Sequence, residues 1–381
     1  MIEKERIVEE FCNLVSIDSV SFHEREMADV LKEKLVALGA TVEEDKAGDS
    51  CGGNAGNVYA FLKGTLPGEP LLFSAHMDTV VPGIGKKAVR KADGRIESDG
   101  NTVLGADDLG GIVAILEALT VIKERKIPHR DIEILFPVAE EVYAKGSSIF
   151  DYSKIQSKEA YTMDLSGRVG YASLQEPTII SFTITVNGKA SHAGFAPEEG
   201  VNAIAIASKA IAGIEQGRVG EDTTVNLGCI KGGSARNIVS ELVTIDGEIR
   251  SYSHEKALKQ LEIIKNTFTQ AIDSYNESHS NQEGVKAACN IADRIEIVAY
   301  KVDESEQVVK RFLSICDQLG YEGNLTKTFG GSDNNCFIRN GIRGIVLACA
   351  MNQVHSTKEY TEVDELVKIS NIVLNLMLSE Q

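Results

Sequence analysis

Strand-like apolar runs alternate with helical segments at both ends of this chain, and a segment with a different order interrupts them. Before residue 178, apolar runs such as residues 58–62 and 71–75 are followed by a stretch with helical periodicity at residues 112–125. Strands that alternate with helices predict an α/β layer with a largely parallel sheet. From residue 178 to residue 300, the predicted order is strand, helix, two strands, helix and strand, which is typical of a ferredoxin-like α+β unit.

This interruption predicts one α/β domain built from both ends of the chain. Its two parts are residues 1–177 and 301–381, and residues 178–300 form a separate lid or dimerisation domain. An insertion of this length is an ordinary domain size. The 381 residues of the chain are enough for both domains.

The charge balance narrows the possible partners. The chain has 56 Asp and Glu against 39 Lys and Arg, a formal net charge of −17. A surface this acidic repels phosphate backbones and anionic lipids, so we expect no nucleic-acid partner and no membrane binding. No apolar run approaches the roughly 18 residues of a membrane span, and we expect no signal peptide. Seven scattered cysteines without a CxxC spacing indicate reduced thiols, so we expect a cytoplasmic protein.

Histidine and acidic residues recur where predicted strands end or a predicted helix begins. The positions that share this placement are His76, Asp107, Glu140–Glu141, Asp164 and His355. In open α/β sheets, groups beyond the carboxyl ends of the strands converge on one crevice. Two imidazoles with several carboxylates are typical ligands of zinc and related divalent ions. The repeated placement therefore predicts a metal site, although a single residue of this kind is more often an ordinary surface group.

Five segments of the chain resemble the metal-site segments of the co-catalytic zinc exopeptidase family. They are His-Met-Asp-Thr-Val at 76–80, Gly-Ala-Asp-Asp-Leu-Gly-Gly at 105–111, Ala-Glu-Glu at 139–141, Met-Asp at 163–164 and the late His355. That family includes peptidase T, the glutamate carboxypeptidases, the aminoacylases and related dipeptidases. The match extends from the N-terminus to about residue 375, and within the family the chain most resembles the peptidase T-like tripeptidases.

The resemblance implies a site for two zinc ions, for which manganese or cobalt could substitute. It places His76 and Asp164 on one ion. Glu141 and His355 would bind the other ion, and Asp107 would bridge the two. Two such ions can share one water and polarise the scissile carbonyl.

The resemblance also assigns two residues to the catalytic machinery. Glu140 matches the general acid/base, which would activate the water between the ions. Asp78 would accept the other N–H of the His76 ring and so fix its tautomer. A cis peptide bond between Asp107 and Asp108 is implied as well.

The lid domain carries three further matches. His192, in Ala190-Ser191-His192-Ala193-Gly194, resembles the lid histidine that reaches the partner's active site in dimeric members and stabilises the oxyanion. Asn237 and Arg250, thirteen residues apart, match groups that hold the polar ends of the substrate. The Arg guanidinium suits a peptide C-terminal carboxylate because it binds bidentately. The alternatives are a turn histidine at His192 and a strand-end salt bridge at Arg250.

A glycine-rich loop is the last match. Gly330, Gly331 and Ser332 resemble the loop that borders the substrate, where backbone N–H groups could bind carbonyl or carboxylate oxygens. A helix N-terminal loop without a ligand is the alternative.

These matches imply metal-dependent hydrolysis of short peptides, with release of the N-terminal residue from tripeptides, by a homodimer paired through the lid domain. A dipeptidase, a carboxypeptidase and an N-acyl amino acid hydrolase could use the same site. An aminopeptidase family with a similar dizinc site has a differently built insertion, so the βαββαβ segment argues against it. A non-catalytic peptide-binding protein would be expected to have lost a ligand or the base, and neither is missing.

Overall fold

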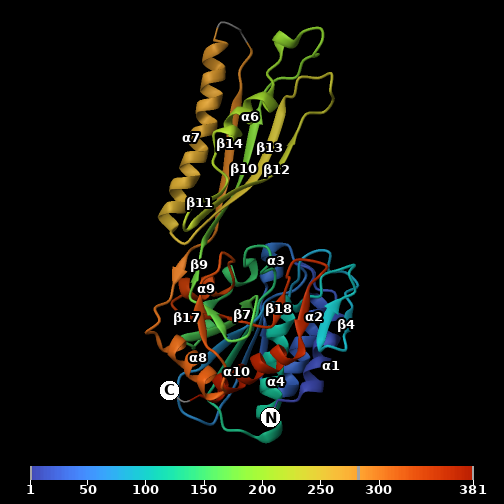
Figure 1. The fold of residues 1–381 in the computed structure, drawn as a ribbon, viewed down its shortest axis with the longest axis vertical. Coiled ribbons are helices and arrows are strands. Elements are labelled where there is room, and N and C mark those ends of the chain that lie inside the picture. The colour runs from blue at the N-terminus through green and yellow to red at the C-terminus, as the bar shows by residue number, and fades with distance from the viewer. Residues whose placement is uncertain (1, 281–283, 380–381) are drawn as a thin grey trace. The chain divides into compact units, whose positions relative to one another are not determined.

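The structure is a computed structural model that describes residues 2–280 and 284–379. The chain forms two compact units, which we call the α/β unit (Met1–Glu176 with Lys301–Gln381) and the inserted unit (Pro177–Tyr300). Each unit has a sheet of its own (Figure 1). In the described part of the chain, no helix combines the length and the apolar character that crossing a bilayer needs.

An eight-stranded mixed sheet forms the centre of the α/β unit. Its strands, in spatial order, are β1 (Thr41–Glu44), β2 (Val58–Leu62), β6 (Ile132–Phe136), β3 (Leu71–Ser74), β7 (Glu159–Leu165), β17 (Arg343–Ala348), β8 (Tyr171–Ser173) and β16 (Asn324–Thr326). The four central strands β6, β3, β7 and β17 are parallel, and the direction reverses at β2 and at β8. The prediction of a mixed, largely parallel sheet is confirmed.

Burial explains why the central strands are short apolar runs. Every residue of β3 and β6 is buried, as expected for parallel strands that are covered on both faces. Helix α4 (Ala106–Arg125) lies against β3 and β7. It is apolar on almost all sides because α1 (Lys4–Val15), α2 (Arg25–Leu38) and α10 (Val363–Leu378) pack around it (Figure 1).

The remaining elements of the α/β unit are short or peripheral. The strands β18 (Met351–Asn352), β19 (Tyr360–Glu362), β5 (Arg95–Ser98) and β4 (Ala88–Arg90) form a small sheet, and β9 (Gln175–Glu176) pairs with β15 (Tyr300–Lys301). The other helices are α3 (Ala47–Cys51), α5 (Lys145–Ser148), α8 (Gln307–Gln318), α9 (Asn334–Arg339) and the 3-10 turn Tyr152–Lys154. The sequence of the hairpin β4–β5 shows no strand pattern, because its side chains are mostly exposed and only Ile96 is buried.

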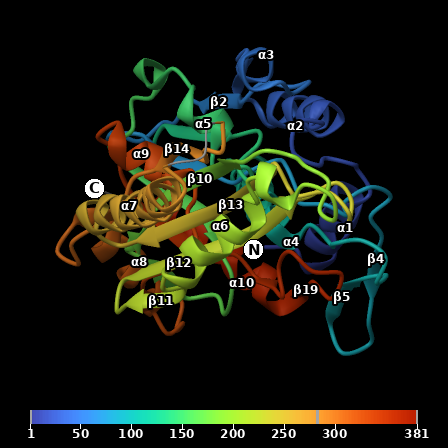
Figure 2. The same ribbon diagram turned by 90° about the horizontal axis from the view of Figure 1, so that it is seen from above.

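The inserted unit is an antiparallel sheet with two helices on one face (Figures 1 and 2). The sheet order is β11 (Gly217–Gly220), β12 (Thr223–Gly232), β13 (Leu242–Ser251), β10 (Thr178–Asn187) and β14 (Ala288–Ile297). The helices are α6 (Ala203–Ala212) and α7 (His254–Ser278), and a 3-10 turn spans Pro197–Glu199. Without the edge strand β11, the order is that of a ferredoxin-like βαββαβ unit, as predicted.

Two details of the inserted unit correct the sequence prediction. Strand β14 ends at Ile297, so it begins and ends earlier than the strand predicted near residues 294–300. In its first half, residues 288–292, small residues dominate and no side chain is fully buried, so hydrophobic periodicity marks it only weakly. Strand β11 was not predicted because it is a short exposed edge with a glycine at each end.

Candidate metal centre

The predicted ligands meet at the carboxyl ends of adjacent strands. His76 lies two residues beyond β3, Glu140 and Glu141 follow β6, and Asp107 lies in the first turn of α4. His355 lies between β18 and β19. Because β6 and β7 both pair with β3, the chain segments that follow these strands begin side by side. Asp164 differs from its prediction in one detail, since it lies within β7 and not beyond its end.

The Asp107 carboxylate faces both histidines. Its Oδ1 lies 3.1 Å from Nε2 of His76, and its Oδ2 lies 3.2 Å from Nε2 of His355. His355 Nε2 also lies 3.0 Å from Oε2 of Glu141. The two oxygens of one carboxylate thus face the two predicted histidine ligands, as the predicted bridging role of Asp107 requires.

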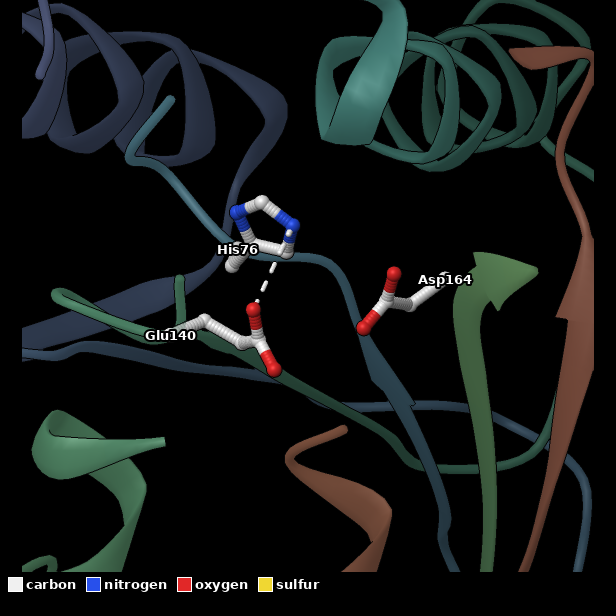
Figure 3. Close-up of side chains that lie close together, drawn as sticks. All are labelled: His76, Glu140 and Asp164. Carbon is white, nitrogen blue, oxygen red and sulfur yellow. Dashed lines mark ion pairs between the residues drawn. The ribbon is translucent and has the colours of Figure 1, made fainter. Parts of the chain in front are cut away.

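Two groups of side chains in the described part of the chain could hold a metal ion. The ligand atoms of His76, Glu140 and Asp164 lie within 4.8 Å of one another, as do those of His76, Asp107 and Glu141. Figure 3 shows the first group, in which His76 Nε2 lies 3.9 Å from Oε2 of Glu140. His76 belongs to both groups, so the two groups form one continuous cluster.

The electrostatics of this cluster fit divalent cations. Burial raises the pKa of Glu140 and Asp164 well above the usual range, and neighbouring carboxylates add to the effect. The buried Oε1 of Glu141 has no hydrogen-bond partner. Hydrogen bonds to Asp107 and Glu141 raise the pKa of His355 to about 10. Carboxylates and imidazoles gathered in this way are the donors that zinc and similar ions use.

Asp78 contacts three residues of the site, Glu140, Glu141 and His76. Its carboxylate accepts the backbone N–H groups of Glu140 (2.9 Å) and Glu141 (3.2 Å) and the hydroxyl of Ser21 (2.7 Å). The Nδ1–H of His76 donates to the Asp78 backbone carbonyl at 2.9 Å, whereas the carboxylate is 3.5 Å away. The predicted partner of the His76 ring is thus Asp78, but through its main chain, because the carboxylate already accepts three other donors.

The first turn of α4 explains the pattern Asp-Asp-Leu-Gly-Gly. The peptide bond between Asp107 and Asp108 is cis, as the resemblance implies. The Asp108 carboxylate accepts the backbone N–H of His76 (3.2 Å) and the thiol of Cys349 (3.3 Å). A Cβ on Gly110 would lie 2.5 Å from the Cys349 carbonyl oxygen, and one on Gly111 would lie 2.5 Å from Cβ of Met163. Both glycines therefore permit the close approach of α4 to the strands.

Three buried acidic residues at this site were not predicted. Glu24 Oε1 accepts the N–H of Ala139 (3.0 Å), directly before Glu140. Asp333 is buried and its negative charge contributes to the raised pKa of Glu140. Glu359 accepts the N–H groups of Leu104 (2.7 Å), Gly105 (2.8 Å) and Asp107 (3.0 Å), and so fixes the loop that leads into Asp107. The groups of the site that Glu24 and Glu359 bind lie 115 to 255 residues away in the chain, so no local pattern marks these two residues.

We expect Glu359→Ala to weaken metal retention by about 10- to 100-fold, the usual cost of losing a group that orients a ligand. The variant leaves three buried N–H groups around Asp107 without their acceptor. Metal content after dialysis against graded chelator concentrations measures the effect. Glu362→Ala, which changes a more exposed glutamate three residues on, is the matched control. Equal metal retention by both variants would refute this role.

Three of the predicted substrate residues lie in the inserted unit. His192 forms a β-bridge with Ile238, and the N–H of Ala193 donates to the Asn237 carbonyl at 3.0 Å. The segments of His192 and Asn237 therefore lie side by side. Arg250 lies near the other end of β13 and pairs with Glu248, with Nε 2.9 Å from Oε1. A strand-end salt bridge, the alternative for Arg250, is thus present.

The glycine-rich loop precedes α9. Gly330 and Gly331 are half-buried. Ser332 is buried, its hydroxyl donates to the Glu176 carboxylate (2.9 and 3.0 Å), and its N–H donates to the side chain of Asn335. Both polar groups of Ser332 therefore have partners within the protein, and its contact with substrate stays a prediction.

Comparison with known proteins places this site in a family. A sequence profile described as Peptidase dimerisation domain matches residues 175–278, and one described as Peptidase family M28 matches residues 57–194. The uncharacterised protein YqjE of Bacillus subtilis is 38% identical over 377 residues, 99% of each chain.

Two solved structures are similar along almost the whole chain. Aminopeptidase PepT from Bacillus cereus is 36% identical, with a TM-score of 0.87, over 99% of this chain and 98% of that one. A tripeptidase from Staphylococcus aureus is 34% identical, with a TM-score of 0.91, over the same shares of the two chains. The chain therefore belongs to the peptidase T-like members of the co-catalytic dizinc exopeptidase family.

Proposed function

We propose that the protein hydrolyses peptide bonds in short peptides and releases the N-terminal residue of tripeptides. The observation that carries the proposal is the Asp107 carboxylate, which faces His76 and His355 with its two oxygens beside the buried Glu140. The aminopeptidase and the tripeptidase that it resembles over nearly its full length support this reading.

We assign the metal ligands as the family resemblance does. His76 and Asp164 would hold one zinc ion, and Glu141 and His355 the other. Asp107 would lie between the two ions. When bound, the ions would lower the pKa of the attacking water and polarise the scissile carbonyl. Manganese or cobalt could replace zinc, because imidazole and carboxylate donors serve all three.

Glu140 acts as the general base and then as the general acid. Burial raises the pKa of its carboxyl group above the usual range, and a carboxyl group with a raised pKa is suited to take and return a proton. The backbone N–H of Glu140 donates to the Asp78 carboxylate, and that of the preceding Ala139 donates to the Glu24 carboxylate, so the main chain at Glu140 is fixed. The carboxylate accepts a proton from the attacking water and passes it to the leaving amine.

The remaining predicted residues hold the ends of the peptide. Arg250 would exchange its pairing with Glu248 for the C-terminal carboxylate of the substrate, since both partners are partly exposed. Asn237 and the backbone of Gly330 and Gly331 would bind other polar groups of the substrate. His192 would donate a hydrogen bond to the developing oxyanion.

The geometry within the inserted unit supports the proposal that His192 acts on the partner's active site. Arg250 is the ninth residue of β13, so roughly 26 Å of strand separate it from Leu242. Asn237 and His192 lie past Leu242, on the side away from Arg250, where backbone hydrogen bonds continue the strand pairing. A tripeptide spans only about 11 Å. One peptide therefore cannot contact Arg250 and Asn237 of the same chain, and a homodimer that pairs through the inserted unit would supply them from two subunits.

Mixing two inactive variants tests this arrangement. Glu140→Ala and His192→Ala subunits, denatured and refolded together, should regain roughly a quarter of wild-type activity, because half of the dimers are mixed and each has one intact site. Each variant refolded alone is the control. If the mixture stays as inactive as the separate variants, each site is built within one subunit.

Matched peptides distinguish this activity from its alternatives. We expect purified protein with zinc to hydrolyse tri-alanine and to leave N-acetyl-tri-alanine and di-alanine largely intact, measured by release of free alanine. An N-acyl amino acid hydrolase would prefer the acetylated peptide, a carboxypeptidase would tolerate it, and a dipeptidase would prefer di-alanine. Calorimetric binding of tri-alanine without product would instead indicate a peptide-binding protein.

We also propose a cytoplasmic location. All seven cysteines are free thiols, three of them buried. Reduced thiols are typical of proteins in a reducing compartment, which supports this location.

A further inference from the structure

The His192 ring is stacked on the ring of Phe195. Their centroids lie 4.1 Å apart, with an angle of 20° between the ring planes. Phe195 is 85% exposed, the highest value among the exposed large hydrophobic side chains of the described residues. A phenylalanine in this position contributes little to the core, so its contact with His192 is the interaction that gives it a role.

Two backbone donors face one nitrogen of the His192 ring. The N–H groups of Gly194 and Phe195 each donate to Nδ1 at 3.2 Å. Nδ1 must therefore present its lone pair. In the neutral imidazole the proton then resides on Nε2, which makes Nε2 a hydrogen-bond donor.

The backbone of this turn is anchored on both sides. The N–H of Ala196 donates to the His192 carbonyl at 3.0 Å, which closes the turn. The N–H of Ala193 donates to Asn237, and that of Val239 donates to Ser191, both at 3.0 Å. The donors that face Nδ1 are thus held in place by the strand pairing around His192.

We propose that Phe195 is a positioning residue which, together with this turn, holds the His192 imidazole as an Nε2–H donor for the carbonyl oxygen of a peptide substrate. The inference rests on the proposed function, because it concerns the oxyanion that forms when a peptide bond is attacked. The turn sets which nitrogen carries the proton, and the stacked phenylalanine limits rotation of the ring. A preorganised donor of this kind stabilises the transition state more than the bound substrate, so its loss affects kcat.

The tautomer can be observed directly. Solid-state NMR of the zinc-loaded protein with 15N-labelled histidine should show His192 with a protonated Nε2 and an unprotonated Nδ1. The chain has seven histidines, and the signal lost in His192→Ala gives the assignment. A protonated Nδ1 would overturn the inference whether or not the protein hydrolyses peptides.

Amide replacements locate the donor by kinetics. The side-chain nitrogen of glutamine can occupy the place of Nε2, whereas that of asparagine corresponds to Nδ1. We expect His192→Gln to keep at least about 10-fold more of kcat than His192→Asn, since one oxyanion donor contributes about 100-fold or more. Higher activity of the asparagine variant would contradict the assignment.

Variants of Phe195 test the stacking. Phe195→Ala should lower kcat by about 3- to 10-fold with a smaller change in KM, whereas Phe195→Tyr should retain the wild-type kcat. Ile263→Ala, which truncates an exposed apolar side chain on α7, is the control for surface truncation. Wild-type kcat in Phe195→Ala would refute the positioning role. If the wild-type enzyme itself does not cleave tripeptides, the proposed function fails while the NMR result still decides the tautomer.

Discussion

Replacing Glu140 with alanine is expected to lower kcat for tri-alanine by about 1,000-fold and to leave the metal content unchanged. Glu140 is buried next to His76, and the family resemblance assigns it as the general acid/base and not as a ligand. Without the carboxylate, no described group that we assign to the site can move the proton from the attacking water to the leaving amine. The fall should appear in kcat with little change in KM.

The experiment must distinguish whether Glu140 is a general base or a metal ligand, because its carboxylate oxygen also lies within 4.8 Å of the ligand atoms of His76 and Asp164. Glu140→Gln, which keeps the shape of the side chain, should be as inactive as the alanine variant and still bind two ions. Glu141→Ala is the matched comparison, since we assign Glu141 as a ligand and expect that variant to lose metal. If Glu140→Gln also loses one ion, Glu140 is a ligand and the assignment of the base is wrong.

Removing the metal should abolish hydrolysis and lower the thermal midpoint by roughly 10 °C. The three assigned carboxylates, Asp107, Glu141 and Asp164, carry three negative charges, which two divalent ions more than compensate. Without the ions, these groups repel one another in a buried site. A ligand present at about 1,000 times its Kd stabilises the folded state by about 4 kcal/mol, and each kcal/mol shifts the midpoint of a domain of about 150–250 residues, close to the size of the α/β unit that holds the site, by roughly 2–4 °C.

Calorimetry with and without chelator measures this shift, and activity after adding back zinc, manganese or cobalt shows which ion serves. Asp107→Asn is the informative control, because it removes the proposed bridge and should lose most of the chelator-dependent shift. Hydrolysis that resists the chelator, or a midpoint that does not change, would contradict a metal-dependent enzyme.

The sequence by itself indicated the ligand set and the fold class. His76, Glu140 and Glu141 come after buried apolar strands, and parallel strands direct the residues beyond their carboxyl ends to one edge of the sheet. Such a short-range relation between a strand and the next residues is visible in the sequence. The ferredoxin-like order of the inserted unit was predicted for the same reason, since most of its elements have clear periodicity. The exposed strand β11 was missed, and β14 was predicted too late in the chain.

Only the tertiary structure decided which groups orient the ligands. Glu24 and Glu359 act on Ala139 and Asp107 from 115 and 252 residues away, and the partner of the His76 ring is the main chain of Asp78. Burial and the hydrogen bonds of Ser332 likewise could not be predicted. The physical reason is that strand and helix patterns record local burial. The partner of a buried carboxylate is instead whichever backbone N–H the fold brings to it, so the sequence indicated the candidate ligands and the fold determined how they are held.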